Sequence, residues 1–175
     1  MSSLSDPSDE VDLLRSTLTL VAGIPDVTVL AGVAELLVRV DTAYGATPFW
    51  AQVRAEGIAG ATIVLALSWR HAVWLTFGGR PVAFVGLAPS EYRNGEYELC
   101  RVMVDPEWSG RGVGRRCITS ALAWLDERHF ASELCVFAGE TKLISWYERC
   151  GYESDSGIVS TSHSLSMVLM RRPAH

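Results

Sequence analysis

The chain lacks the features that mark several common protein classes. Its four cysteines are widely spaced, with no C-x-x-C pair, so we expect reduced core thiols and no metal site. The longest apolar run, Ala61 to Leu67, is far too short to span a bilayer. The first ten residues are rich in Ser and Asp, unlike the basic and then apolar start of a signal peptide. These absences predict a cytoplasmic protein without a membrane partner.

Two nucleotide-binding motifs are also missing. No Gly-Lys pair occurs, which excludes a P-loop of the form G-x-x-x-x-G-K-[ST]. In a dinucleotide motif G-x-G-x-x-G that starts at Gly112, the third glycine would fall on Cys117. The net charge of −5 argues against nucleic acid, which prefers a basic face, and is compatible with a cationic amine substrate.

The composition indicates one folded domain. A chain of 175 residues with 49% hydrophobic residues is large enough to bury a core and is not disordered. The polar residues 1–10 are expected to form a flexible tail, and residues 11–175 a single domain. No internal repeat or linker divides that segment.

The first third of the chain gives weak signals. Leu14, Leu18 and Val21 have helical spacing, so a helix is plausible over Val11 to Val21. Val27 to Leu30 could be an edge strand. The apolar spacing from Val33 to Tyr44 predicts an amphipathic helix. A second helix could follow over 49–57, after Thr47-Pro48, and Ala61 to Trp69 could be strand or helix.

The remainder of the chain gives a clearer order of three strands, helix, strand, helix and two closing strands. The first two strands form a hairpin around Gly78-Gly79. The expected elements are strands Ala72–Phe77, Pro81–Leu87 and Tyr97–Val104, a helix from Gly114 to about His129, a strand Leu134–Ala138, a helix Thr141–Arg149, and strands near Tyr152–Ser160 and Leu165–Met170. This order predicts a mixed α/β fold.

The stretch from Tyr97 to Gly114 is the centre of the predicted site. Tyr97 to Val104 is rich in apolar and β-branched residues, which suits a buried strand, and Asp105-Pro106 ends it because proline has no N–H. Glycines then alternate at the start of a helix, at Gly110, Gly112 and Gly114. Bare amides at a helix N-terminus bind anions, and a diphosphate is the natural ligand.

Two motifs in these segments resemble signatures of the GNAT acetyltransferase superfamily. The first, R/Q-x-x-G-x-G/A between a strand and a helix, is similar to the run that places its glycines at Gly112 and Gly114, with Ser109 where the family has Arg or Gln. The second is an aromatic-Tyr-Glu-Lys/Arg-x-Gly-Phe/Tyr run, which Trp146 to Tyr152 resembles. Glu140 stands where the family often has Asn. The resemblance implies a central, mostly antiparallel twisted sheet of six or seven strands, flanked by about four helices.

The resemblance also implies acetyl-CoA as co-substrate and assigns its contacts. The backbone of the central strand should pair with the pantetheine arm like an added strand, through Val102, Met103 and Val104. The following loop and helix start should wrap the diphosphate, through Gly110, Arg111, Gly112, Val113, Gly114 and Arg115. Backbone N–H groups near Val104 would polarise the thioester carbonyl.

Two residues are predicted to carry the chemistry. By resemblance, Tyr147 protonates the departing thiolate; a phenol of pKa about 10 can share a proton with a thiol of pKa about 8.5. Glu98 is the candidate base that deprotonates the amine, since it lies on the central strand on the face expected for Cys100, Val102 and Val104. Glu96 is the reserve base, and two histidines, His71 and His163, are further candidates.

The sequence thus predicts an N-acetyltransferase that transfers acetyl directly to a primary amine of a small molecule, peptide or protein. The alternative is a weak or inactive acyl-CoA-binding sensor of the same fold. A longer acyl donor and a homodimer are both possible. Five aromatic residues are candidates to line the acceptor pocket: Tyr44, Phe49, Trp50, Trp69 and Trp74.

Overall fold

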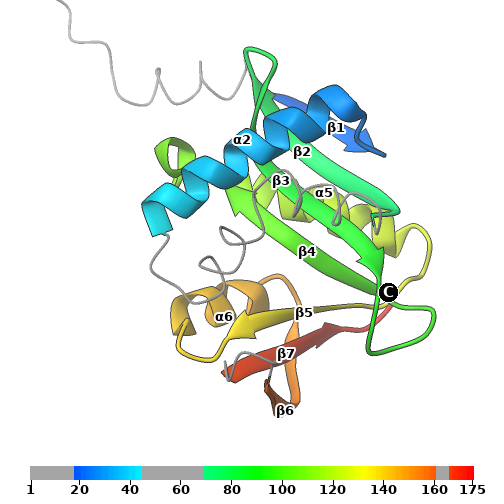
Figure 1. Cartoon of the computed structure of the whole chain (residues 1–175). Coiled ribbons are helices and arrows are strands. Elements are labelled where there is room, and N and C mark those ends of the chain that lie inside the picture. Colours follow the sequence, from blue (N-terminus) through cyan, green and yellow to red (C-terminus); the bar gives the residue numbers. More distant parts are fainter. Residues whose placement is uncertain (1–17, 45–68, 161–165) are drawn as a thin grey trace, which may run out of the picture.

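The structure is a computed structural model that describes residues 18–44, 69–160 and 166–175. The expected tail, the expected helix over 49–57 and the candidate base His163 lie outside these ranges. The described elements, in chain order, are β1 (Thr19–Gly23), α2 (Val27–Tyr44), β2 (His71–Phe77), β3 (Arg80–Pro89), β4 (Tyr97–Val104), the 3₁₀ turn η1 (Pro106–Trp108), α5 (Val113–Asp126), β5 (Ser132–Phe137), α6 (Thr141–Glu148), β6 (Glu153–Ser160) and β7 (Ser166–Arg172) (Figure 1).

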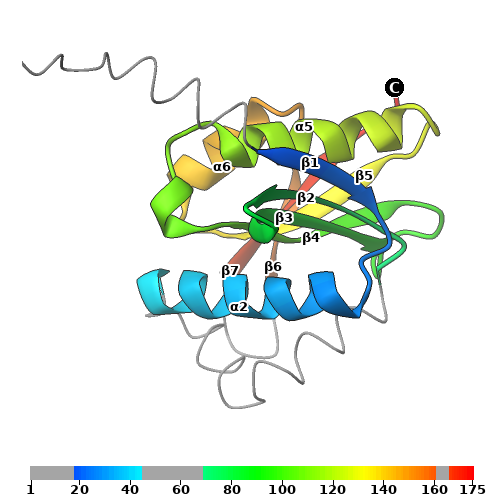
Figure 2. The same cartoon turned by 90° about the horizontal axis from the view of Figure 1, so that it is seen from above.

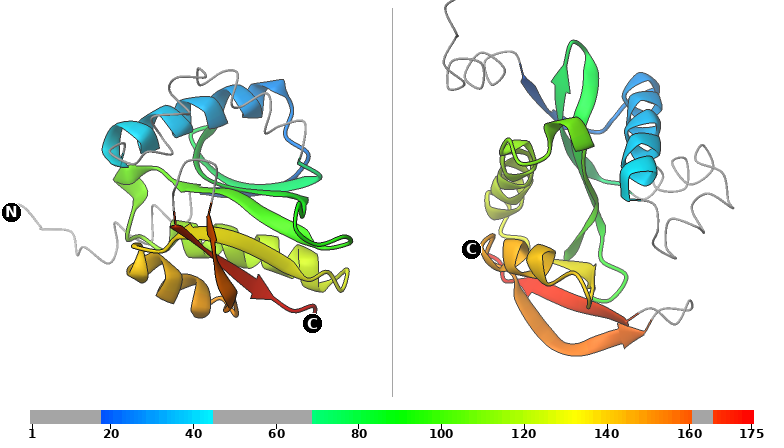
Figure 3. Two further views of the ribbon diagram at one scale, coloured as in Figure 1. Left: turned by 60° about the horizontal axis from the view of Figure 1, so that its bottom comes forward. Right: turned by 90° about the vertical axis from the view of Figure 1, so that its left-hand side faces the viewer.

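The strands form one seven-stranded sheet in the order β1-β2-β3-β4-β5-β7-β6. Every neighbouring pair is antiparallel except β4 and β5, which are parallel. Helix α2 covers one face of the sheet, and α5 and α6 cover the other (Figure 2; Figure 3, right). The prediction of a mixed α/β fold with a mostly antiparallel sheet is therefore confirmed. No helix in the described parts of the chain is long and apolar enough to cross a membrane.

The N-terminal predictions were partly wrong. Thr19 to Gly23 is an edge strand paired with β2, where helical spacing had suggested a helix. Val27 starts α2 instead of forming a strand, because the Asp26 carboxylate accepts hydrogen bonds from the amides of Thr28 and Val29, both at 2.9 Å. That side chain satisfies two amides at the helix start, and the local cap outweighs the β-branched residues of the first turn. The predicted amphipathic helix over Val33 to Tyr44 is confirmed, and its expected end near Gly45 lies outside the described residues.

The hairpin prediction is confirmed. Strands β2 and β3 pair antiparallel around Gly78 and Gly79, whose φ angles of 57° and 80° lie in the left-handed region that glycine adopts without steric cost. The central strand also has the predicted bounds, Tyr97 to Val104.

Two apolar cores lie on opposite faces of the sheet. The larger is formed with α5 and α6 and includes Ile118, Leu125 and Tyr147; the smaller is formed under α2 and includes Leu36 and Phe84. The sheet is therefore buried on both faces through its middle strands, which explains the nearly continuous apolar sequence of β3.

Strand β4 contains a bulge that changes the face on which its last residues lie. Gly86 of β3 pairs with Cys100 and Phe84 pairs with Met103, so two residues of β4 oppose a single residue of β3. Arg101 occupies the bulge with a φ of 55°. As a result Cys100 and Met103 pack together on the α2 face, while Val102 joins the opposite core.

This bulge corrects one prediction. Glu98 was expected to share a face with Cys100, Val102 and Val104, as simple alternation requires. It lies on the α2 face with Cys100, because the flanking Tyr97 packs in the α5 core. Val102 and Val104 lie on the α5 face instead.

Candidate active site

The sheet splits between β4 and β5. The two strands pair only at Tyr97 with Ser132 and at Glu98 with Glu133. Beyond Glu98 they share no ladder, and β5 continues along β7 through its whole length. Figure 1 shows β4 and β5 diverging from this junction toward α6 and η1. Both strands thus present a stretch of backbone edge to the gap, which is the arrangement that accepts an added extended segment.

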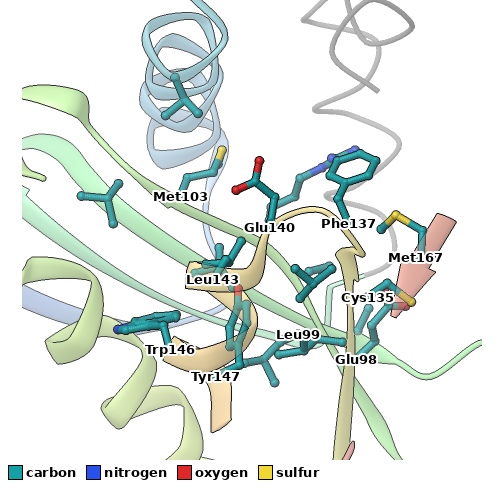
Figure 4. Close-up of a pocket in the computed structure, with 18 of the residues that line it drawn as sticks. Glu98, Leu99, Met103, Cys135, Phe137, Glu140, Leu143, Trp146, Tyr147 and Met167 are labelled. Carbon is teal, nitrogen blue, oxygen red and sulfur yellow. The ribbon is translucent and has the colours of Figure 1, made fainter. Parts of the chain in front are cut away.

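A cavity of about 1060 Å³ occupies the split. Its walls come from both faces of the sheet: Val40 and Met103 from the α2 side, and Leu143, Trp146 and Tyr147 from α6 (Figure 4). A volume of this size holds an elongated organic ligand, and the mixture of apolar walls with a few polar groups is typical of ligand sites.

The glycine-rich loop lies directly after the free end of β4. Gly110 and Gly112 have φ angles of 77° and 75°, and a Cβ at either would meet nothing within 4 Å. Gly114 is different: a Cβ there would come within 2.9 Å of Cγ2 of Val104, so glycine lets α5 approach β4. The loop therefore keeps an open backbone surface beside the split.

The N-terminus of α5 has unused hydrogen-bond donors. Gly112 is the cap in the left-handed conformation, and no side chain caps the helix. Within the described residues, the amides of Val113, Gly114 and Arg115 have no acceptor. Three such amides at one helix start form a site for an anion, because the helix dipole adds to their partial positive charge.

Two arginines flank these amides. Arg111 lies with its guanidinium carbon 5.5 Å from the centre of the Trp108 ring, and Arg115 is exposed in the first turn of α5. Ser109 and Glu140, the two departures from the sequence motifs, both line the cavity. Both arginines are placed to meet an anion at the loop, and their role as diphosphate contacts stays a prediction.

Glu98 is a half-buried carboxylate at the point where the strands separate, and it lines the cavity. Burial raises its pKa to about 7, and the negative charges of Glu91 and Glu133 act in the same direction, while Arg101 opposes them. A carboxylate with such a pKa is partly ionised at neutral pH and can accept a proton from an amine.

The reserve bases are held elsewhere. Both carboxylate oxygens of Glu96 accept hydrogen bonds from Arg171, at 2.6 and 3.1 Å, so this side chain is committed to an ion pair. His71 stacks on Trp124 with ring centres 4.3 Å apart on the α5 face and does not line the cavity. Burial and the charge of Arg128 lower the pKa of His71. Glu98 is therefore the best-placed base among the described candidates.

Tyr147 lies across the split from Glu98. It is 5% exposed, it packs edge-on against Trp146 and Tyr152, and it lines the cavity from α6. Figure 4 shows its hydroxyl pointing from α6 toward the space beside β4, with Glu98 farther along the split beside Cys135. Among the described residues no group hydrogen-bonds this hydroxyl. Burial raises the pKa of Tyr147 well above its ordinary value, so the phenol keeps its proton.

Several cavity residues were not anticipated from the sequence. Tyr92 and Glu91, in the loop before β4, line the acid-rich end beside Glu98. Cys135 and Phe137 of β5 also line the cavity, with Cys135 beside Glu98 (Figure 4). Only the pairing of distant strands brings them to the site, so no local motif could reveal them.

The expected aromatic pocket differs from the structure. Trp69 and Trp74 lie in the core under α2, 4% and 6% exposed, and not in the cavity. Tyr44 does not line the described cavity, and Phe49 and Trp50 are outside the described residues.

The arrangement joins two functions at one gap. An anion site and a free strand edge lie side by side, and the cavity between them carries a proton acceptor on one face of the sheet and a proton donor on the other. A long ligand with an anionic end can lie along the edge, while a second reactant reaches its far end from the α2 face. Such a site suits the transfer of a group between two bound molecules.

Comparisons with known proteins agree with this geometry. The model of the acetyltransferase (GNAT) family matches residues 35–152, more than half of the chain. Among curated proteins, no sequence matches.

Solved structures share the fold at low sequence identity. The ribosomal-protein-S18-alanine N-acetyltransferase from Escherichia coli matches with a TM-score of 0.63 and 20% identity, covering 89% of this chain and 94% of its own. The PaiA N-acetyltransferase from Thermoplasma acidophilum, solved in complex with coenzyme A, has a TM-score of 0.67 at 13% identity, covering 89% and 99%. An acyl-CoA N-acyltransferase from Pseudomonas aeruginosa has the same TM-score and coverage at 16% identity.

Proposed function

This chain belongs to the GNAT acetyltransferase family, and from that premise we propose that it moves the acetyl group of acetyl-CoA directly onto a primary amine. The observation that carries the proposal is the split between β4 and β5, which runs from the uncapped start of α5 to Glu98. An extended thioester with a diphosphate matches this shape, since its charged part needs the amides and its arm needs the strand edge.

Each part of the donor has a place in this proposal. The diphosphate binds the amides of Val113 to Arg115, with Arg111 nearby. The pantetheine arm pairs with the free edge of β4 over Val102 to Val104, where the bulge leaves the ladder with β3 irregular. The thioester then lies between Glu98 and Tyr147. Backbone N–H groups at this edge polarise its carbonyl oxygen.

The chemical step needs one base and one acid. Glu98, directly or through a water molecule, takes a proton from the acceptor ammonium. The freed amine nitrogen attacks the thioester carbon, forming a C–N bond, and the C–S bond breaks as the tetrahedral intermediate collapses. Tyr147 donates its phenolic proton to the leaving sulfur, the resulting phenolate takes the second proton from the nitrogen, and Glu98 releases its proton to solvent before the next cycle. The products are the N-acetylated amine and the free thiol of coenzyme A.

The two faces separate donor from acceptor. Tyr147 belongs to the α5 and α6 side, where the donor sulfur would lie, and Glu98 faces the α2 side. The acceptor therefore approaches from the α2 side, past Glu91 and Tyr92. The carboxylates of Glu91 and Glu98 favour a cationic amine there.

The first experiment measures binding and turnover separately. Calorimetry with coenzyme A tests the donor site, and release of the thiol from acetyl-CoA in the presence of an amine panel tests transfer. The panel should contain small amines and peptides with free N-termini, because one similar structure is named for acting on an alanine of a ribosomal protein. We expect saturable binding and amine-dependent thiol release.

Two results would count against this proposal. Absence of affinity for coenzyme A would remove the donor site. Tight binding without turnover on any amine would favour the alternative of an acyl-CoA-binding sensor, which the unusual Ser109 and Glu140 also allow. A comparison of acetyl-CoA with longer acyl-CoA donors in the same assay identifies the transferred group.

A further inference from the structure

We propose that Asp105 is a positioning residue for the donor, and that with Arg39 and Arg80 it holds the glycine-rich loop in the shape that presents its amides. The inference rests on the proposed function, since it takes the ligand of that loop to be the diphosphate of an acyl-CoA. From the sequence alone, Asp105 was only the residue that precedes the proline at the end of the strand.

The Asp105 side chain is a buried hub. The residue is 1% exposed, and its Oδ2 accepts from Nε of Arg39 at 2.7 Å and from Nη2 of Arg80 at 3.3 Å. Its Oδ1 accepts from the amide of Glu107 at 3.1 Å and so caps η1. Arg39 comes from α2 and Arg80 from the hairpin end of β3, so one carboxylate connects three distant segments.

Backbone bonds complete the attachment. The amide of Asp105 donates to the carbonyl of Val82 at 2.8 Å, and the carbonyl of Asp105 accepts from Trp108 at 2.8 Å. Arg39 also donates to the carbonyl of Pro81 at 3.0 Å. The chain leaving β4 is thus fixed through the end of η1, only two residues before Gly110.

The loop itself has little to hold its shape. Gly110 and Gly112 have no side chains, and no neighbouring atom lies within 4 Å of where a Cβ would stand. Its position therefore depends on its two ends, which are the buried Val113 at the start of α5 and η1 on the other side. A rotation of η1 would turn the loop and misalign the amides, although the sheet and α5 would stay folded.

Two acetyl donors can distinguish a displaced glycine-rich loop from a general loss of structure. Acetyl-CoA needs the diphosphate site, whereas the acetyl thioester of N-acetylcysteamine carries the same reacting bond and no diphosphate. For Asp105→Asn we expect kcat/KM with acetyl-CoA to fall about tenfold, mainly through KM, since a hydrogen-bonded charge is lost from the hub. With the short thioester we expect little change. A general loss of structure would lower both values together.

Asp126→Asn is the matched control. Asp126 forms a two-pronged ion pair with Arg172, at 2.6 and 2.9 Å, at the other end of α5. This variant removes the same kind of charge away from the loop, so the ratio of the two kcat/KM values should match that of the wild type. A change in the ratio as large as that of Asp105→Asn would overturn the inference.

Arg80→Gln gives a second, milder test in case Asp105→Asn does not fold. The Arg80 side chain is 49% exposed, and its removal leaves Asp105 paired with Arg39. We expect the same selective loss with acetyl-CoA, about threefold, because an exposed partner contributes less. If the folded variants weaken both donors equally, or if affinity for coenzyme A is unchanged, the inference is wrong. A wild type without affinity for coenzyme A would instead contradict the proposed function.

Discussion

Two carboxylates, half-buried Glu98 and fully buried Asp105, lie at opposite ends of β4 in opposite surroundings. Glu98 near the start of the strand lies among other acidic groups, and burial raises its pKa to about 7. Asp105, directly after the strand, accepts hydrogen bonds from two arginines and one amide. The same chemical group is thus prepared to exchange a proton at one end and to hold the chain in place at the other. Burial alone does not decide the role; the neighbouring charge does.

The largest expected effect concerns turnover at Glu98. Glu98→Gln keeps the size of the side chain and removes its ability to accept a proton, so kcat should fall by about two to four orders of magnitude. Calorimetric affinity for coenzyme A should be unchanged, because coenzyme A lacks the acetyl group and its diphosphate binds at the other end of the strand. Turnover within a few-fold of the wild type would show that another group or water alone serves as the base. Glu98 would then have no catalytic role to contrast with the structural role of Asp105.

Tyr147→Phe should have the next largest effect. The substitution removes only the hydroxyl from a buried ring, so packing in the α5 core is kept. We expect kcat to fall about ten- to a hundredfold, less than for Glu98, because a thiolate leaves readily even without an acid. Thiol release under saturating acetyl-CoA measures this, with coenzyme A affinity as the control. Unchanged turnover would leave Tyr147 only a structural role.

The two carboxylates should affect stability in opposite directions. Asp105→Asn should lower the free energy of unfolding by about 2–4 kcal/mol at pH 7, because it leaves Arg39 partly buried without its charged partner. Glu98→Gln should raise stability at pH 8, because the wild type must ionise a half-buried acid there. Urea unfolding of both variants and the wild type measures these differences.

The contribution of Glu98 to folding stability should depend on pH. Its folded pKa of about 7 is higher than the ordinary value of 4.5, so the folded state holds the proton more tightly. Its contribution to stability is therefore present below pH 4.5 and is lost as the pH rises through 7. The advantage of Glu98→Gln should grow from pH 5 to pH 8. An advantage that is constant across this range would indicate an ordinary pKa.

The smallest effect is a shift in the pH profile of the wild type. Since the base must be ionised, kcat/KM should rise with pH through a midpoint of about 7. Glu91→Gln should lower this midpoint by a fraction of a unit, because the Glu91 charge raises the pKa of Glu98. Glu127→Gln is the control, as its side chain is 72% exposed near the end of α5. Equal midpoints in all three proteins would assign the titration to the acceptor amine.

Local chemistry explains which features could be predicted from the sequence. The bounds of β4 were correct because an apolar run ends at Asp105-Pro106, and the hairpin was correct because Gly78 and Gly79 specify a turn. The glycine-rich loop was identified for the same reason. The start of α2 was missed although Asp26 is a recognisable cap, because four β-branched or apolar residues after it suggested a strand.

Other features depend on contacts between distant segments. The bulge at Arg101 has no sequence sign, since a residue other than glycine rarely takes a positive φ. It put Val102 and Val104 on the face opposite to the predicted one. The wall formed by Cys135 and Phe137 exists only because β5 stays with β7 when β4 turns away. No pattern in the sequence of β4 or β5 predicts which strand each of them pairs with.

Only two residue pairs connect β4 and β5, so few backbone hydrogen bonds join the two parts of the sheet, although the core on the α5 side packs against both. A ligand that pairs with the free strand edge in this gap would add hydrogen bonds between the two parts of the sheet. Loading the donor would then stiffen β5, α6, β6 and β7 together, and it would slow amide exchange in β6, which pairs with β7 on the side away from the gap. For the same reason, release of the free thiol would require those added hydrogen bonds to break before the next cycle.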